Sequence, residues 1–148
     1  MKFGYRFAGG ASKHPEWTEI MLDYDIKDWR RCTARISPWL DHLRPHVKDC
    51  DVRKTRKGYH VRIWIDLPLI PRRLNDLQAG MGDDGARVRM NERRIKKGIE
   101  SWNRLWLIKF KLDGTVISKE VEAPGCTKQL REMLFPNDSY FREMRTNG

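Results

Sequence analysis

The sequence has few cysteines and no long apolar run. Its three cysteines, Cys32, Cys50 and Cys126, are too scattered for a disulfide framework, and none has the C-x-x-C spacing of a zinc site. No apolar run approaches the ~18 residues that a membrane span needs, and the N-terminus lacks the apolar stretch of a signal peptide. These absences exclude a disulfide-rich domain and a membrane partner, and they favour a cytoplasmic protein.

Positive charge is the excess that the sequence does have. It holds 30 Lys and Arg against 20 Asp and Glu, a formal net charge of +10 over 148 residues. Such a surface attracts phosphate backbones through an interaction that weakens with salt. DNA or RNA is therefore a candidate partner.

The hydrophobic pattern predicts one domain over residues 1–148 with an α+β fold. Strict alternation and turn residues favour a mostly antiparallel sheet with flanking helices. Residues 1–16 are expected to form an arm or a short strand, and residues 136–148 a frayed tail. We expect strands at 17–25, 49–52, 59–65, 87–90, 102–111 and 116–121, and helices at 26–47, 72–81 and 126–135, the first bent at Pro38.

Two aspartates close the first predicted strand of the sheet. In Leu22-Asp-Tyr-Asp25 the carboxylates are two residues apart, so Asp23 and Asp25 share a face and repel each other. A divalent cation between them would relieve that repulsion, and Mg²⁺ favours a few carboxylates together with substrate phosphates. The competing interpretation is a strand end that turns polar, with Asp25 capping the next helix.

A basic turn precedes the most apolar strand. In Arg53-Lys-Thr-Arg-Lys-Gly58-Tyr-His60, the turn could grip phosphates, and Gly58 permits a close backbone approach. Tyr59 adjoins the turn and is placed to stack on a base. The competing interpretation is a structural His60 beside a turn that is merely solvated. No second histidine lies two residues from His60, which argues against a His-x-His nickase.

A third cluster follows the Asp83–Asp84 turn. Arg87, Arg89 and Arg93 suit contact with phosphates or a template strand, although a solvated basic edge that blocks strand pairing explains them equally well.

Taken in order, these segments resemble the archaeo-eukaryotic primase superfamily, which includes the primase-polymerases. Met21-Leu-Asp-Tyr-Asp25 looks like its Asp-x-Asp motif, and Thr55-Arg-Lys-Gly-Tyr-His-Val61 is similar to its Ser-x-His-type motif. Val88-Arg-Met-Asn-Glu92 looks like its third motif, with Asn91 where an Asp is expected. The resemblance covers roughly residues 17–111, and its most specific part is the Gly-Tyr-His block.

The resemblance implies an RRM-like sheet with a small α/β unit, and nucleotidyl transfer from nucleoside triphosphates with Mg²⁺ or Mn²⁺. Asp23, Asp25 and position 91 would face the metal. Thr55, Lys57, Gly58 and His60 would hold the triphosphate, while Arg56, Tyr59 and the three arginines of the third cluster would contact DNA or RNA. A minimal catalytic core of the kind that viruses and mobile elements carry would fit, together with a helicase or another replication partner.

Asn91 keeps an oxygen ligand but loses a charge. Either Glu92 or the Asp83–Asp84 pair supplies the third acid, or the residue was altered, or activity is impaired. The main rival function is therefore a non-catalytic nucleic-acid-binding protein with a primase-like fold. A metal-dependent nuclease that uses the same acids and an α+β interaction module are also compatible with these residues.

Overall fold

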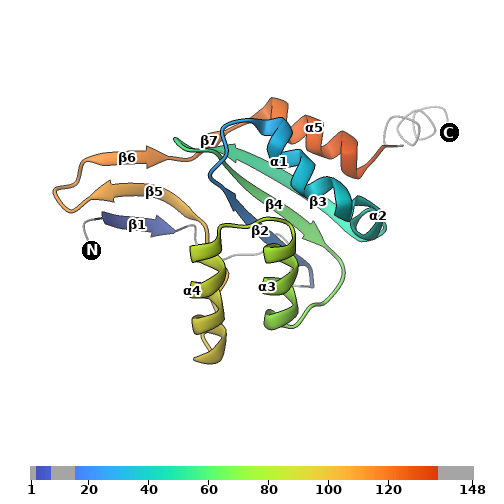
Figure 1. The fold of residues 1–148 in the computed structure, drawn as a ribbon, viewed down its shortest axis with the longest axis horizontal. Helices are drawn as coiled ribbons and strands as arrows, with labels where there is room; N and C mark the ends of the chain where they lie inside the picture. Colours follow the sequence, from blue (N-terminus) through green and yellow to red (C-terminus); the bar gives the residue numbers. More distant parts are fainter. Residues whose placement is uncertain (1–2, 8–15, 137–148) are drawn as a thin grey trace.

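The computed structural model describes residues 3–7 and 16–136, and the expected frayed tail lies almost wholly outside them. The described chain forms two antiparallel sheets with flanking helices, an α+β fold (Figure 1). Its strands are β1 (Phe3–Phe7), β2 (Thr18–Tyr24), β3 (Val47–Lys54), β4 (Tyr59–Ile65), β5 (Trp106–Lys111), β6 (Val116–Lys119) and β7 (Val121–Glu122). Its helices are α1 (Trp29–Ile36), α2 (Leu40–Leu43), α3 (Pro71–Gly80), α4 (Gly85–Lys96) and α5 (Pro124–Leu134).

The larger sheet has the strand order β2-β4-β3-β7, and every pair in it is antiparallel. Strand β4 lies between β2 and β3, which α1 and α2 connect, so this part of the chain has the split β-α-β arrangement of RRM-like folds. The register sets Asp23 opposite His60, and His60 opposite Arg53. Residues that oppose each other share a face, so the pairing places these three side chains in one row.

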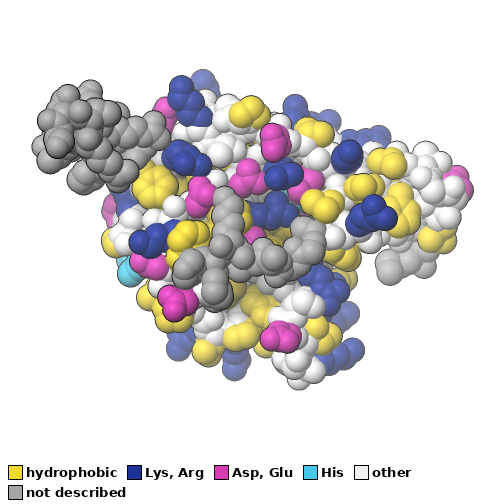
Figure 2. All heavy atoms as spheres, turned by 180° about the vertical axis from the view of Figure 1, so that it is seen from behind, with side chains coloured by type: hydrophobic (Ala, Val, Ile, Leu, Met, Phe, Trp, Pro, Cys, Tyr) yellow, Lys and Arg dark blue, Asp and Glu magenta, His cyan; other side chains and the backbone are white. Residues whose placement is uncertain are grey.

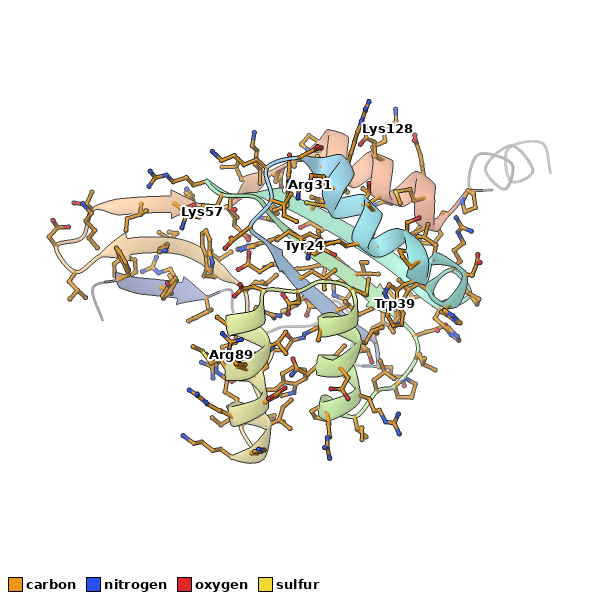
Figure 3. All side chains as sticks on the ribbon, in the orientation of Figure 1. Tyr24, Arg31, Trp39, Lys57, Arg89 and Lys128 are labelled. Atoms are coloured by element: carbon orange, nitrogen blue, oxygen red, sulfur yellow. The ribbon has the colours of Figure 1, made fainter. Side chains whose placement is uncertain are left out.

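One face of the larger sheet is apolar and carries the core. Ile20, Leu22 and Tyr24 alternate along β2 and are fully or almost fully buried, as strict alternation predicts. Helices α1, α2 and α5 lie over this face (Figure 1), and their buried side chains join the same core cluster. Tyr24 lies beneath α1 in Figure 3 and donates its hydroxyl hydrogen to the carbonyl of Met81, at 2.7 Å.

The opposite face of the larger sheet is polar. It carries Asp23, His60 and Arg62 where the other face carries aliphatic side chains. Seen from behind the view of Figure 1, acidic and basic side chains are mingled over the middle of the molecule (Figure 2). This face is where the chemistry predicted from the sequence gathers.

A smaller unit adjoins that face. It consists of the three-stranded sheet β1-β5-β6 and the helices α3 and α4, which project from the edge of the larger sheet (Figure 1). The sequence-based assignment of a strand to residues 87–90 is wrong, because these residues lie within α4. Asp84 caps this helix by accepting a hydrogen bond from the Arg87 amide, at 3.1 Å.

Side chains of α3 and α4, and of the segments that follow each helix, cover the outer edge of β2. Gln78 and Asp83 accept hydrogen bonds from the amides of Met21 and Asp23, each at 2.9 Å. Arg87 donates to the Met21 carbonyl at 3.0 Å, and Asn103 to the Glu19 carbonyl at 3.1 Å. An edge strand that would otherwise present free backbone groups is thereby satisfied, and Asp23 is held in place.

The other predicted elements are found with shifted ends. The first helix is interrupted at a short 3₁₀ turn, Ser37–Trp39, which contains Pro38. The predicted strand 102–111 begins at Trp106, and the predicted strand 116–121 is split into β6 and β7. Among the described residues, no helix has both the length and the apolar character needed to cross a bilayer.

Candidate functional site

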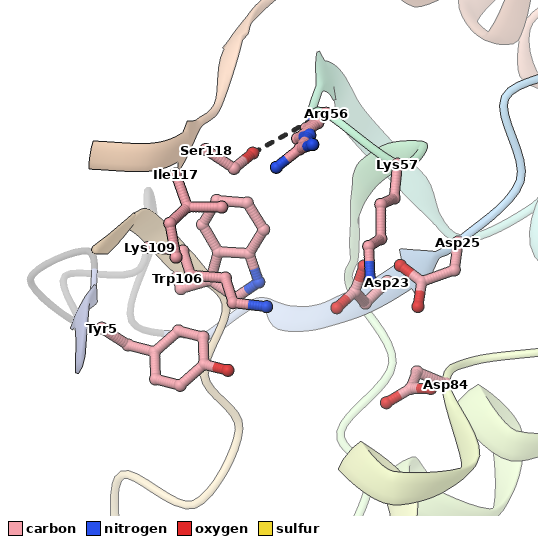
Figure 4. A pocket seen from close by; sticks show the side chains of 10 residues that line it. All are labelled: Tyr5, Asp23, Asp25, Arg56, Lys57, Asp84, Trp106, Lys109, Ile117 and Ser118. Atoms are coloured by element: carbon pink, nitrogen blue, oxygen red, sulfur yellow. Dashed lines mark hydrogen bonds between the residues drawn. The ribbon is translucent and has the colours of Figure 1, made fainter. Parts of the chain in front are cut away.

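Asp23 and Asp25 line one hollow between the two sheets, as their shared face predicts (Figure 4). Asp23 lies near the end of β2 with 16% of its side chain exposed, and Asp25 follows the strand and is exposed. The hollow measures about 180 Å³, and we call it the Asp23 hollow. It is lined by Tyr5, Asp23, Asp25, Arg56, Lys57, Asp84, Trp106, Lys109, Ile117 and Ser118.

Acidic, basic and aromatic side chains all line the Asp23 hollow. Asp84 faces the two strand aspartates from the start of α4, while Lys57 reaches in from the β3–β4 turn (Figure 4). Trp106 and Lys109 line the other side from β5. Carboxylates can hold a hard cation, ammonium and guanidinium groups can bind phosphate, and indole can stack on a base. The arrangement therefore suits a phosphorylated ligand bound together with a divalent cation.

His60 is fully buried between two carboxylates. Its Nδ1 lies 2.8 Å from Oε2 of Glu120, a hydrogen bond. Its Nε2 lies 3.6 Å from Oδ1 of Asp23, too far for a hydrogen bond, and it forms no hydrogen bond with any residue that the structure describes. The Trp106 ring stacks edge-on against it at 4.6 Å between centroids. His60 therefore contacts Asp23 rather than the open hollow, and the phosphate contact expected of it does not fit this geometry.

Glu120 completes this buried group, and the sequence reasoning missed it. Its side chain is 2% exposed and lies 3.7 Å from Arg62 and 3.6 Å from Arg53. Burial alone would raise the pKa of Glu120, but the hydrogen bond with His60 and the charge of Arg62 outweigh burial, and the pKa is lowered. Because a charged carboxylate accepts, Nδ1 of His60 is the donor in this pair. Its partner is 60 residues away in the chain, so no local signal could have identified it.

Asp23 has the opposite electrostatic character. Its pKa is raised to about 6, chiefly by burial and to a smaller extent by the negative charges of Asp25 and Asp83, while the charges of His60 and Arg87 act in the opposite direction. A carboxyl group that is costly to ionise gains from a nearby cation, which stabilises the charged form. The pKa of Asp23 thus makes it responsive both to protons and to cations near neutral pH.

The β3–β4 turn has the close backbone approach that Gly58 predicts, but neither Thr55 nor Gly58 lines the hollow. Thr55 is buried and its Oγ1 accepts a hydrogen bond from the Gly58 amide, at 3.1 Å. A Cβ on Gly58 would lie 1.8 Å from the Tyr24 carbonyl oxygen, so only glycine permits this approach. The amide of Arg56 donates to Ser118, at 3.1 Å. Thr55 and Gly58 shape the turn, and Arg56 and Lys57 are the residues that it presents to the hollow.

The expected stacking role of Tyr59 does not fit the structure. Tyr59 is 7% exposed and packs against Trp29 of α1, with 5.1 Å between ring centroids. It points to the apolar face of the sheet because it opposes Tyr24 in the register. Tyr59 is therefore a core residue.

The three arginines of the third cluster have different surroundings. Arg87 is buried and bonds to Asp83, Asn103 and the backbone of β2, so it is part of the edge cover and not of a nucleic-acid surface. Arg89 and Arg93 are exposed on α4 and are not among the described residues that line the Asp23 hollow. Figure 3 shows Arg89 on α4, well away from Lys57.

Asn91 is not brought to the strand aspartates. It is fully buried between α3 and α4, where its Nδ2 donates to Oδ1 of Asn75 at 3.2 Å. It follows Asp84 by seven residues, or about 10 Å along a helix. This geometry favours the Asp83–Asp84 pair as the source of a third acid, since Asp84 lines the hollow.

The donor set fits a cation that keeps most of its water. Among residues 3–7 and 16–136, no group of three or more His, Cys, Asp or Glu side chains is arranged to hold a metal ion. Mg²⁺ is usually bound through one or two carboxylates, with water and substrate phosphates as its other ligands. Asp23 and Asp25 can provide those carboxylates, and the nearby basic residues can retain the phosphates.

The acidic and basic residues of the hollow, together with the motif resemblance, are the observations from which a function can be proposed. Compared with protein-family models, curated proteins and solved structures, the chain matches none of them.

Proposed function

We propose that this chain is a divalent-metal-dependent nucleotidyltransferase of the primase–polymerase kind, which makes or extends nucleic-acid primers from nucleoside triphosphates. The observation that carries the proposal is the Asp23 hollow, where Asp23, Asp25 and Asp84 face Arg56, Lys57 and Lys109 across a space of about 180 Å³. The order of the Asp-x-Asp and Gly-Tyr-His motifs in the sequence supports the same class of reaction.

In this reaction a 3′-hydroxyl gives its proton to water, its oxygen forms a bond to the α-phosphorus, and the bond from that phosphorus to the bridging oxygen breaks, so that pyrophosphate leaves. Asp23 and Asp25 would hold Mg²⁺ or Mn²⁺, and this cation would offset the negative charge of the phosphates. Lys57 and Arg56 bind and orient the triphosphate, because ionised donors form the stronger hydrogen bonds to phosphate. Asp84 faces the same space from the N-terminal end of α4 and takes the place that the motif comparison gave to Asn91.

His60 acts as a positioning residue in this proposal. Its ring is fixed by Glu120 on one side and by Trp106 on its edge, so Nε2 is held facing the Asp23 carboxylate. A carboxylate whose neighbours are fixed keeps its orientation for a cation, as second partners do in known metal sites.

The test is incorporation of labelled nucleotides on primed and unprimed templates with Mg²⁺ or Mn²⁺. Asp25→Asn and Asp84→Asn are expected to reduce incorporation on the order of 100-fold, because each removes a charge from the hollow. Asp76→Asn, an exposed aspartate on α3 outside the hollow, is the matched control and should keep wild-type activity. Wild-type protein that incorporates nothing with either metal would overturn the proposal.

A non-catalytic nucleic-acid-binding protein is the second candidate. It is favoured by the lack, within the described ranges, of three or more grouped metal-ligating side chains. This candidate predicts salt-sensitive binding of nucleic acid without incorporation, and binding that Asp25→Asn leaves intact. Cleavage of the labelled strand would instead indicate a nuclease.

A further inference from the structure

Strand β1 presents a row of aromatic rings to solvent. Phe3, Tyr5 and Phe7 alternate along the strand, so they share one face, and each is 38% exposed. The rings of Tyr5 and Phe7 are neighbours, with centroids 6.2 Å apart and planes tilted by 30°. Three large apolar side chains left exposed in one row form a patch of the kind that marks a binding surface.

Basic side chains are interleaved with these rings. Lys109 opposes Tyr5 in the register and Lys111 opposes Phe3. The Lys109 ammonium lies 4.9 Å from the Phe3 ring centroid and 5.8 Å from that of Tyr5, and Arg104 lies 5.9 Å from that of Phe7. The row is therefore an aromatic surface with positive charge beside each ring, which suits an anionic ligand that has flat apolar parts.

A second hollow, on the β1-β5-β6 sheet, adds further positive charge next to the aromatic row. It measures about 460 Å³ and is lined by Phe3, Arg56, Lys57, Lys109, Lys111, Thr115, Val116 and Ile117. None of these described lining residues is acidic, and half of them are basic. Such a surface attracts a chain of phosphates more strongly than it attracts a neutral or mixed-charge peptide.

The aromatic row and the Asp23 hollow are continuous. Arg56, Lys57 and Lys109 line both hollows, and Tyr5 belongs both to the row and to the Asp23 hollow. Figure 4 shows Tyr5 and Lys109 on the side of the Asp23 hollow opposite to Asp25. A ligand lying along β1 would thus end beside the carboxylates.

We propose that Phe3, Tyr5, Phe7, Lys109 and Lys111 form a docking surface for an unpaired strand of nucleic acid and lead it to the Asp23 hollow. Bases stack on the rings, and the lysines bind the phosphates between them. The strand must be unpaired, because the bases of a duplex already have their faces covered by stacked neighbours. In the proposed reaction this strand would be the template, and that role rests on the proposed function, whereas the binding itself requires no catalysis.

The test is fluorescence anisotropy of a labelled 20-nucleotide oligothymidine titrated with the full chain at several salt concentrations. Tyr5→Ala is expected to weaken binding roughly 10-fold through the loss of one stacked base, whereas Tyr5→Phe keeps the ring and should bind like the wild type. Lys109→Ala should weaken binding and lower the slope of log affinity against log salt by about 0.7. Lys128→Ala, an exposed lysine on α5 (Figure 3), is the matched charge control and should change neither.

Three outcomes would overturn the docking surface. These are no binding of the oligonucleotide at low salt, equal affinity of Tyr5→Ala and Tyr5→Phe, and competition by a duplex as strong as that by the unpaired strand. Sedimentation that shows a dimer lost in Tyr5→Ala would identify a second copy of this chain as the occupant instead. Oligonucleotide binding that depends on Tyr5, in a protein that incorporates no nucleotide, would keep this inference and refute the proposed function.

Discussion

His60 lies between two carboxyl groups whose environments shift their pKa values in opposite directions. The pKa of Glu120 is lowered, so this group is charged near neutral pH, whereas burial raises the pKa of Asp23 to about 6. Two acids whose pKa values are pushed apart by their surroundings take different roles at one site. At the scale of single residues, Glu120 orients His60, and Asp23 is the group that responds to protons or cations.

We expect Glu120→Gln to lower the free energy of unfolding by about 2 kcal/mol, because it removes the charged acceptor of His60 and weakens the pairing of buried Arg62, whose other carboxylate partner, Glu19, lies at 3.8 Å. The lowered pKa of Glu120 adds stability above the unfolded pKa, near 4.5, and this contribution is lost as the pH falls through the folded value. Urea unfolding should therefore show a larger difference from wild type at pH 7 than at pH 3. Glu122→Gln, on the exposed strand β7, should be nearly neutral, and equal costs for the two variants would contradict this account.

Asp23→Asn should stabilise the protein at pH 8 by about 3 kcal/mol, since the wild type must ionise a carboxyl group whose pKa is raised from 3.8 to about 6. A raised pKa favours folding below the unfolded value, and this advantage is lost as the pH rises through 6. The gain from the substitution should thus vanish near pH 4. The measurement is urea unfolding of both proteins across that range. Asp25→Asn, at an exposed position, should raise the free energy of unfolding by less than Asp23→Asn does. A gain from Asp23→Asn that does not change with pH would refute the raised pKa of Asp23.

At the scale of elements, the sequence pattern predicts strands better than it predicts α4. Strands β2 and β4 stand out because both are rich in apolar and β-branched residues, which alternate in β2 with more polar ones. In α4 the buried positions are Arg87 and Asn91, four residues apart as a helix requires, but polar. Hydrophobic periodicity cannot identify a helix whose buried residues are polar. The alternation of Arg87 and Arg89 with apolar residues is also the pattern expected of a strand. The useful signal was Asp84, a good helix N-cap.

The site was predictable where its residues are neighbours in sequence. Asp23, Asp25 and Lys57 follow from a strand end and a turn, and they do line the hollow. Trp106 and Tyr5 line the hollow from strands that are distant in the chain, and Glu120 reaches His60 from the segment between β6 and β7, so only tertiary structure brings these residues to the site. Tyr59 was misplaced because its position next to the turn suggested exposure, whereas its register with Tyr24 directs it into the core.

Substitutions of Arg87 and Arg89 test whether the buried side of α4 holds the edge of β2. Arg87→Met should lower the free energy of unfolding by about 3 kcal/mol, because it leaves Asp83 buried and unpaired and removes a donor to the Met21 carbonyl. It should also speed hydrogen exchange at the amides of Met21 and Asp23. Arg89→Met, on the exposed side of the same helix, should change stability by less than about 0.5 kcal/mol. Equal exchange rates in both variants would show that α4 does not hold the edge of β2.

At the scale of the whole molecule, the Asp23 hollow draws on both sheets and on the start of α4. A cation bound there should therefore stabilise the fold as a whole. At ten times its dissociation constant, Mn²⁺ should add about 1.4 kcal/mol, which raises the melting temperature by roughly 3–6 °C. Thermal melts at pH 7.5 would measure the shift.

The Mn²⁺ shift should shrink at pH 5, because protons then compete for Asp23, whose pKa is about 6. It should disappear in Asp25→Asn and persist in Asp76→Asn. A shift of the same size in all three proteins would place the ion elsewhere.

The side-chain cover of the β2 edge has a consequence for the handling of this protein. Ile20, Leu22 and Tyr24 alternate along β2, an apolar edge strand of the kind that can pair with a strand of another chain. The backbone N–H and C=O groups through which such a strand would pair are bonded instead to Gln78, Asp83, Arg87 and Asn103. Substitutions that loosen α3 or α4 should therefore first appear as lower soluble yield and fibrous precipitate on expression. Variants of this helix pair should be tested for aggregation before a loss of activity is attributed to the site.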